Sequence, residues 1–331
     1  MESRRAFLKG VVASGAAVTA ASVATPASAR ETLERPPEAL GLLYDSTLCV
    51  GCKACVAACK DANGMPPEPG AGADGALWDS PLDLSGRTLN VIKVYRHGNA
   101  QQKDHAENGF AFVKKSCLHC VDPSCVSACP VSAMTKNPKT GVVNYDKDAC
   151  IGCRYCVAAC PFGVPRFTYD TPIPQINKCQ LCQHRWADGK YAACAEVCPT
   201  GATLFGTVAE LEQEIGRRRA LIPGTPTDYP RGRVGGGDAS SPGVAATYVD
   251  HVYGEKELGG TQLMMLSGVP FEKLGYPKLP ERSYAADSET VQTALYGGMA
   301  LPIVFLGGLT WLAKRNVKND EHADEGDHDG R

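Results

Sequence analysis

The feature that most constrains this chain is the distribution of its cysteines. All 16 lie between Cys49 and Cys198 and make up roughly a tenth of that stretch. A hydrophobic core does not require such a density, so the pattern indicates disulfides, metal sites or metal clusters. The cysteines form four groups of four with none left over: Cys49, Cys52, Cys55 and Cys59; Cys117, Cys120, Cys125 and Cys129; Cys150, Cys153, Cys156 and Cys160; and Cys179, Cys182, Cys194 and Cys198.

The spacing inside the groups narrows these possibilities. The first and third groups read C-x2-C-x2-C-x3-C, the other two widen the middle gap, and the last three groups end in Cys-Pro. Bacterial ferredoxins use this run for [4Fe–4S] clusters, with three cysteines on one cluster and the fourth on its neighbour. Zinc ribbons use paired C-x2-C knuckles instead. We predict four [4Fe–4S] clusters held by iron–thiolate bonds; the alternatives are a zinc-stabilised interaction module and a disulfide scaffold.

Four clusters with every iron ligated leave no open position for a substrate, so we predict an electron carrier and not an enzyme, with no catalytic residue. Lys plus Arg is 34 and Asp plus Glu is 36, a net charge of −2, which does not favour nucleic-acid binding. Cations beside the groups could offset cluster charge, or could simply be solvated. These are Lys53, Arg154, Lys178 and Arg185, while His119 is expected beside a cluster or exposed rather than as a ligand.

The N-terminal residues predict export. Residues 3–9 contain Arg4 and Arg5, a small-residue apolar run follows over 10–24, and 27–29 read Ala-Ser-Ala. This pattern is typical of a twin-arginine signal peptide, cleaved after Ala29. The alternative is an N-terminal membrane anchor. Because twin-arginine substrates are exported after folding, thiolate-bound iron is compatible with a periplasmic location.

The C-terminal residues predict a membrane anchor. Residues 294–313 carry no charged side chain, and as a helix they would extend ~30 Å, the thickness of the hydrocarbon layer. Lys314, Arg315 and Lys318 follow, as expected for the cytoplasmic side. We predict a transmembrane helix over 291–313, anchored in the inner membrane through 294–313, with a cytoplasmic tail over 314–331. A buried helix of a soluble core is the alternative.

Secondary structure is expected to be α+β. Residues 89–96 and 110–115 alternate like two strands of an inserted hairpin. Thr207 and Glu210 form a capping-box pattern for a helix that runs to about Ala220. Residues 222–243 are rich in Pro and Gly and predict an irregular surface segment. The domain plan is a signal peptide over 1–29, a cluster domain over 30–206, and a helix with an extended docking segment over 207–290.

Four stretches carry a resemblance to a known family: residues 44–52, 115–123, 253–257 and 315–320. On these and the cysteine groups, the chain resembles the four-cluster ferredoxin-type electron-transfer subunits of anaerobic respiratory complexes. Among them it is most similar to the HybA-type iron–sulfur subunits of membrane-bound [NiFe] hydrogenase 2, over nearly its whole length.

The resemblance implies a ligand scheme in which an inner ferredoxin-like module, about 108–172, is nested inside an outer one. Spacing alone does not derive this nesting. The implied clusters are cluster 1 with Cys49, Cys52, Cys55 and Cys198; cluster 2 with Cys59, Cys179, Cys182 and Cys194; cluster 3 with Cys117, Cys120, Cys125 and Cys160; and cluster 4 with Cys129, Cys150, Cys153 and Cys156.

The resemblance also implies partners. The chain would pass electrons between the large and small subunits of a hydrogenase and an integral membrane quinone-reacting subunit, at the periplasmic face of the bacterial inner membrane. The alternative is the β subunit of a formate dehydrogenase or a related molybdoenzyme. A twin-arginine signal on the subunit itself disfavours that alternative. The order of the clusters and the direction of electron flow do not follow from the sequence.

Overall fold

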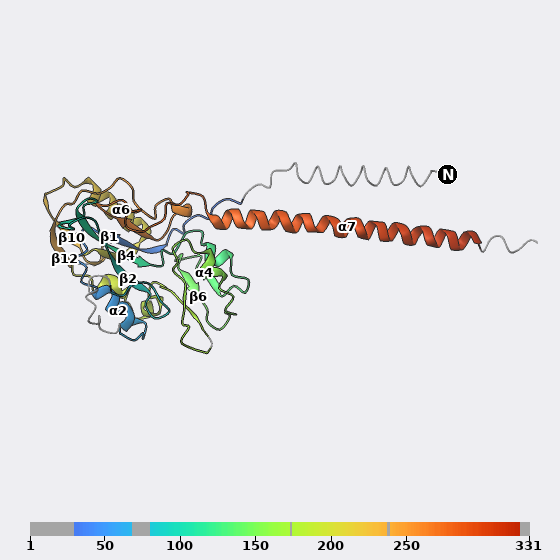
Figure 1. The fold of residues 1–331 in the computed structure, drawn as a ribbon, viewed down its shortest axis with the longest axis horizontal. Helices are drawn as coiled ribbons and strands as arrows, with labels where there is room; N and C mark the ends of the chain where they lie inside the picture. Colours follow the sequence, from blue (N-terminus) through green and yellow to red (C-terminus); the bar gives the residue numbers. More distant parts are fainter. Residues whose placement is uncertain (1–29, 68–79, 173, 237–238, 325–331) are drawn as a thin grey trace, which may run out of the picture. The chain divides into compact units, whose positions relative to one another are not determined.

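The computed structural model describes residues 30–67, 80–172, 174–236 and 239–324 (Figure 1). The described chain divides into two compact units. One unit is Thr32–Ala285, and the described part of the other is residues 30–31 with 286–324. The expected signal peptide over 1–29 lies outside the described residues.

Within the described residues, a four-stranded sheet joins the two ends of the cysteine-rich region. Its strand order is β11-β9-β1-β13. Strand β1 (Leu40–Asp45) pairs antiparallel with β9 (Thr203–Thr207) and parallel with β13 (Leu263–Leu266), and β11 (Gly232–Arg233) lies parallel to β9. All of β13 and nearly all of β1 are buried. Because β1 precedes the first cysteine group and β9 follows the last, their pairing closes the cysteine-rich region.

Helix α6 (Val208–Ala220) covers one face of this sheet. It starts with the capping box that the sequence predicts: Thr207 Oγ1 accepts from the Glu210 N–H at 3.3 Å, and the Glu210 carboxylate accepts from the Thr207 N–H at 2.8 Å. These bonds satisfy N–H groups that a helix start leaves free. The apolar side chains of the helix pack with those of β1, β9 and β13 in a core that includes Val208, Leu211 and Ile215.

A second sheet comes from the segment between the first and second cysteine groups. Strand β2 (Asn90–Arg96) pairs antiparallel with β4 (Gly109–Ser116), and the short β3 (Gln102–Lys103) adds to β4 in parallel. The two strands predicted at 89–96 and 110–115 are therefore confirmed. Residues 111–114 of β4 are all buried, so both faces of this strand are covered. The strand brings Lys114 into the interior.

The cysteine groups themselves lie in loops joined by short elements. The helices are α2 (Ala54–Ala62), α3 (Ser124–Ser127), α4 (Tyr155–Ala159) and α5 (Ala193–Glu196), with the 3-10 helix η2 (Gln183–Asp188). Helix α2 packs with α5, and α3 packs with α4. Two small hairpins complete this part, β5 (Met134–Lys136) with β6 (Val143–Tyr145), and β7 (Arg166–Phe167) with β8 (Ile176–Asn177). The helix of the first cysteine group therefore packs with the helix of the fourth group, and the helix of the second group packs with that of the third.

The segment after α6 differs from the expectation of irregular structure. Strands β10 (Pro226–Pro230) and β12 (Ser240–Val244) form an antiparallel ribbon, and the pairing satisfies backbone groups of this Pro- and Gly-rich stretch. After it comes the 3-10 helix η3 (Glu257–Gly259). Tyr253, Phe271 and Tyr276 then enter the main hydrophobic core, which also contains cysteines of the first and fourth groups. The chain to Ala285 is thus folded into the unit that holds the cysteines.

Helix α7 (Tyr284–Asp324) contains the stretch that was expected to cross the membrane. It has 41 residues, with Pro302 in its interior. In the part of the chain that the structure describes, no helix combines the length and the apolar character that a membrane crossing requires. The transmembrane helix predicted over 291–313 is therefore not shown by the structure.

Candidate functional site

Three pockets of the Thr32–Ala285 unit are each lined by four cysteines. We name each pocket after its first cysteine. The Cys49 pocket is lined by Cys49, Cys52, Cys55 and Cys198; the Cys59 pocket by Cys59, Cys179, Cys182 and Cys194; and the Cys129 pocket by Cys129, Cys150, Cys153 and Cys156. Each pocket combines cysteines that are distant in sequence. In each one, three cysteines come from one group and the fourth from another.

The remaining four cysteines also lie together, and we name them the Cys117 group. Burial raises the pKa of Cys120, and nearby Cys125, Cys160 and Cys117 raise it further because like charges repel. Cys125 has a raised pKa from burial and from the same neighbours, Cys117 and Cys160. The fold therefore brings all sixteen cysteines together in fours.

The cysteine loops repeat one backbone conformation. Two residues after the first cysteine of each group, the chain adopts a left-handed conformation, at Gly51 (φ 69°), His119 (φ 51°), Gly152 (φ 72°) and Leu181 (φ 56°). This turn directs an N–H to the first sulfur: the Gly152 N–H donates to Cys150 Sγ and the Leu181 N–H donates to Cys179 Sγ, both at 3.4 Å. Such bonds stabilise a thiolate. A glycine suits the conformation in two groups, and buried side chains occupy it in the other two.

Burial shapes the chemistry of the thiols. It raises the pKa of Cys49, Cys156 and Cys194 to about 11 and that of Cys59 to about 12. A buried thiol stays protonated unless a cation compensates the charge of its thiolate. Metal binding provides that compensation and releases the proton. Four sulfurs around a mostly apolar space fit an iron–sulfur cluster by donor chemistry.

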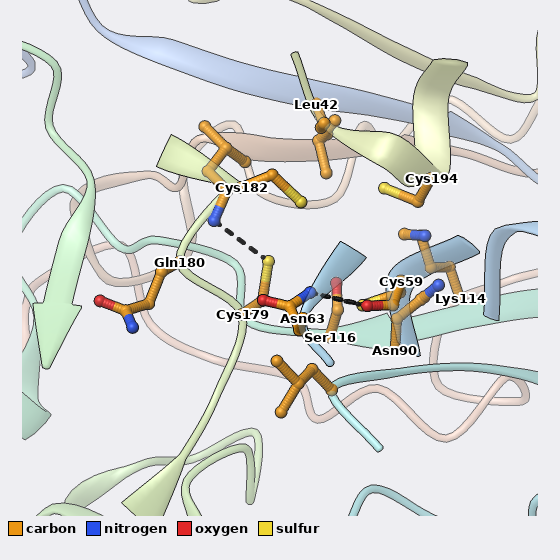
Figure 2. Close-up of a pocket in the computed structure, with 13 residues that line it drawn as sticks. Leu42, Cys59, Asn63, Asn90, Lys114, Ser116, Cys179, Gln180, Cys182 and Cys194 are labelled. Atoms are coloured by element: carbon orange, nitrogen blue, oxygen red, sulfur yellow. Dashed lines mark hydrogen bonds between the residues drawn. The ribbon is translucent and has the colours of Figure 1, made fainter. Parts of the chain in front are cut away.

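Polar side chains line the Cys59 pocket alongside its cysteines: Asn63, Asn90, Lys114, Ser116 and Gln180 (Figure 2). Asn63 Nδ2 donates to the Cys59 carbonyl at 2.7 Å and lies 3.8 Å from Cys59 Sγ. Lys114 from β4 is 1% exposed, and its Nζ has no hydrogen-bond partner among the described residues. Burial acts to lower the pKa of Lys114, but the nearby thiols, Cys194 first, outweigh burial and hold it above its usual value.

Sequence reasoning missed Lys114. In a strand that alternates, a lysine next to the buried Val113 is expected to face solvent. The sequence did contain a sign that one lysine is buried: Lys114 and Lys115 are neighbours in one strand, and alternation sends neighbouring side chains to opposite faces. One of them had to face the interior if both faces of β4 were covered.

The predicted cationic neighbours have different environments. Lys53 lines the Cys49 pocket and Arg154 lines the Cys129 pocket, each as the left-handed residue just before a short helix. The buried Lys178 Nζ donates to the Cys179 carbonyl at 3.1 Å and to the Val143 carbonyl. These three cations therefore lie beside cysteines of the pockets.

The other two predicted neighbours make protein contacts of their own. Arg185 Nη2 pairs with Glu196 at 2.5 Å, and its Nη1 donates to the Tyr191 carbonyl. His119 is buried, and burial lowers its pKa, so its neutral ring accepts the Val143 N–H at Nδ1, at 3.1 Å. Of the two positions expected for His119, beside a cluster site or exposed, the structure excludes the exposed one.

The four sites follow a linear order. Cys55 of the Cys49 pocket lies close enough to Cys194 of the Cys59 pocket to raise its pKa. Cys179 and Cys160 pack against the small apolar cluster that contains Cys117, which links the Cys59 pocket to the Cys117 group. Cys125 packs against the small core that contains Cys156, which links the Cys117 group to the Cys129 pocket.

The two ends of this order reach the surface. Cys52 in the first pocket and Cys153 in the last are the two exposed cysteines, and the other fourteen are buried or half-buried. Beside them, Val50 is 55% exposed and Ile151 is 66% exposed. The terminal sites are thus accessible from outside.

Comparison with known proteins identifies relatives of this chain among iron–sulfur proteins. Two family matches, each described as a 4Fe-4S dicluster domain, cover residues 41–130 and 109–208. The hydrogenase-2 operon protein HybA of Escherichia coli O157:H7 is 47% identical over 331 residues, which cover 99% of each chain. The formate dehydrogenase iron-sulfur subunit of Haemophilus influenzae is 34% identical over 210 residues, 63% of each chain. The first likeness spans the chain, whereas the second spans less than two thirds of it.

Proposed function

This chain belongs to the family of the hydrogenase-2 operon protein HybA, and from that premise we propose that it carries electrons between a hydrogenase catalytic pair and a membrane quinone-reacting subunit. It is an iron–sulfur electron-transfer subunit whose two dicluster domains correspond to four [4Fe–4S] clusters. The observation that carries the proposal is the linear order of four cysteine sites, with an exposed cysteine at each end.

The proposed ligands follow the four sites. Support comes from the three pockets and the Cys117 group, each of which combines cysteines distant in sequence. Cluster 1 has Cys49, Cys52, Cys55 and Cys198; cluster 2 has Cys59, Cys179, Cys182 and Cys194; cluster 3 has Cys117, Cys120, Cys125 and Cys160; cluster 4 has Cys129, Cys150, Cys153 and Cys156.

The protein's own residues have three tasks in this function. Its thiolates bind the irons, its loop N–H groups stabilise those thiolates, and its core excludes water from the interior sites. The bound clusters supply one-electron oxidation and reduction. Clusters 1 and 4 are the proposed points of electron exchange with partners, because each has an exposed cysteine, Cys52 or Cys153, and the two sites between them have none.

The proposed partners are the large and small subunits of a hydrogenase and an integral membrane quinone-reacting subunit, in a complex that faces the periplasm. The relative that supports this is named for a hydrogenase-2 operon. Export by the twin-arginine route, through residues 1–29, is part of the proposal. The formate dehydrogenase relatives suggest a second candidate, but the likeness covers only 63% of this chain.

Two measurements test this function. Anaerobically purified protein should contain about sixteen irons per chain, four for each cluster, and should give an EPR signal on reduction. In membranes that contain the complex, hydrogen should reduce these clusters, and the quinone pool should no longer be reduced by hydrogen when this chain is deleted. Stoichiometric zinc with little iron would contradict the cofactor assignment. Reduction by formate but not by hydrogen would favour the second candidate.

The nested ligand set has its own test. Replacing Cys160 by Ser should perturb the cluster held with Cys117, and replacing Cys59 by Ser should perturb the one held with Cys179. If instead the first group shared its clusters with the second, and the third with the fourth, the Cys160 substitution would disturb the cluster bound by Cys179. Separate EPR spectra of the two variants distinguish the schemes.

Export can be tested separately. Replacing both Arg4 and Arg5 by Lys should leave the precursor in the cytoplasm, as judged by fractionation. Normal export of this double variant would exclude the twin-arginine route.

A further inference from the structure

Lys114 is a buried cation without a buried carboxylate to neutralise it. Its side chain is 1% exposed, and no described residue makes an ion pair or a hydrogen bond with its Nζ. The groups that act on it electrostatically are thiols, in the order Cys194, Cys55, Cys59 and Cys179. An uncompensated buried ammonium is strongly destabilising. A compensating negative charge is therefore expected where these sulfurs meet.

The expected site of this negative charge is the Cys59 pocket, because Lys114 is one of the residues that line it (Figure 2). Three of the four sulfur ligands proposed there are among the groups that act on Lys114. Ser116, two residues along β4, lines the same pocket, and its buried hydroxyl also has no partner among the described residues. The strand thus presents an ammonium and a hydroxyl to one space, and both can donate hydrogen bonds to an anionic group.

The other two pockets are built differently. The Cys49 pocket has Lys53, which is half-buried, and the Cys129 pocket has Arg154, which is exposed. The guanidinium of Arg154 lies 5.9 Å from the ring centre of Phe167 and 5.8 Å from that of Tyr169. A solvated charge acts through a high effective dielectric, whereas a buried one at the same distance acts several times more strongly. Among the lining residues of these pockets, Lys114 is the cation with the largest expected electrostatic effect.

We propose that Lys114 is a positioning residue that raises the reduction potential of the cluster at the Cys59 pocket. The inference rests on the proposed ligand set. Reduction adds one negative charge to the cluster, and a fixed ammonium at the pocket wall favours that state over the oxidised one. A smaller effect is expected on the cluster of the Cys49 pocket, because Cys55 is also near Lys114.

The test uses the full chain, purified anaerobically in its complex, and potentiometric titration followed by EPR. Lys114→Met removes the charge and keeps the length of the side chain. The equilibrium constant for one-electron reduction of one cluster should fall at least tenfold, which corresponds to about 59 mV. Lys114→Arg keeps the charge, so this variant should retain most of the reduction potential of the unmodified protein. Ser116→Ala should lower the same potential by less.

Lys115→Met is the matched control. Lys115 is the next residue of the same strand, but its Nζ lies 3.7 Å from the ring centre of Tyr276 and donates to the Gly275 carbonyl. All four potentials should stay unchanged in this variant.

Two results would overturn the proposal. One is a set of four unchanged potentials in Lys114→Met protein that retains its full iron content. The other is loss of about four irons with no change in the remaining potentials, in both Lys114→Met and Lys114→Arg, which would make Lys114 a requirement for cluster assembly. An iron content far below sixteen in the unmodified protein would instead count against the four-cluster assignment.

Discussion

The outer and inner cysteine sites are made by the same repeated loop but are enclosed to different extents. We call the Cys49 and Cys59 pockets the outer region, and the Cys117 group with the Cys129 pocket the inner region. In the outer region six cysteines are buried, whereas in the inner region only Cys117 and Cys156 are. The loop conformation is common to both regions, so the difference arises from what packs around the loops.

The surroundings explain the contrast. The outer region packs against the four-stranded sheet, and four of its cysteines (Cys49, Cys55, Cys194 and Cys198) belong to the largest core cluster among the described residues. The inner region has strands of two or three residues and a small core around Met134, Val143 and Ile176. So little apolar burial does not support an independent fold, and cluster binding can supply the missing free energy. The outer region is held by its core, and the inner region depends on its ligands.

The largest expected effect comes from removing iron. Anaerobic chelation should raise the amide exchange rates of β5 and β6 by orders of magnitude, because the inner region loses most of its stabilisation. The amides of β1, β9 and β13 should remain protected. Hydrogen exchange with mass spectrometry measures both regions in one sample. Equal loss of protection in the two regions would remove the proposed difference.

The next effect concerns the ion pair between Arg218 of α6 and Asp45 of β1, which joins the helix to the four-stranded sheet. Arg218 and Asp45 have fully buried side chains, with Nη1 2.8 Å from Oδ2, and Arg218 Nε also donates to Glu214. Replacing Arg218 by Met leaves the buried Asp45 carboxylate without the cation that pairs with it, so we expect a loss of about 3–5 kcal/mol in unfolding free energy. Urea unfolding monitored on the outer region measures this loss.

Arg217 provides the control for that prediction. It pairs with the same Glu214, but its side chain is 39% exposed. Replacing it by Met should cost less than about 1 kcal/mol. Equal losses for the two variants would show that burial of the pair is not what matters.

A smaller effect separates two glycines at equivalent positions. Gly51 in the outer region and Gly152 in the inner region have nearly the same φ, 69° and 72°. A methyl group on Gly51 would overlap the ring of Phe112, whereas one on Gly152 meets no atom within 4 Å. Both substitutions by Ala should cost about 1–2 kcal/mol from the left-handed conformation. Gly51→Ala should cost about 1–3 kcal/mol more because the ring must move. Thermal unfolding compares the two.

The smallest expected effect depends on pH. Burial acts to raise the pKa of Glu214, but hydrogen bonds from Arg217 and Arg218 outweigh it and hold that pKa below its usual value. A lowered folded-state pKa contributes stability above the unfolded pKa of about 4.3, and this contribution disappears as the pH falls through the folded value. Glu214→Gln should therefore cost about 1 kcal/mol near pH 7. In urea unfolding, the difference from the unmodified protein should shrink as the pH falls below about 4.3 and vanish below the lowered folded pKa; a constant difference would refute the assignment.

Local patterns predicted much of the fold. The strands at 89–96 and 110–115 and the capping box at Thr207 follow from alternation and from a three-residue spacing, both of which depend on neighbouring residues alone. The parallel pairing of β13 with β1 joins residues more than two hundred positions apart, and no local signal encodes it. The ribbon of β10 and β12 was missed because Pro and Gly weaken the strand pattern.

The sequence by itself determined the cluster chemistry, because the number, type and spacing of ligands are local properties of the chain. Four groups of four cysteines already implied four [4Fe–4S] clusters and an electron carrier. The tertiary structure decided what surrounds each group: which cysteines share a pocket, which sites neighbour one another, and that Lys114 faces sulfur rather than water. The reason is physical. Burial and electrostatic environment are sums over residues that folding brings together from distant parts of the chain, and spacing along the chain does not contain those sums.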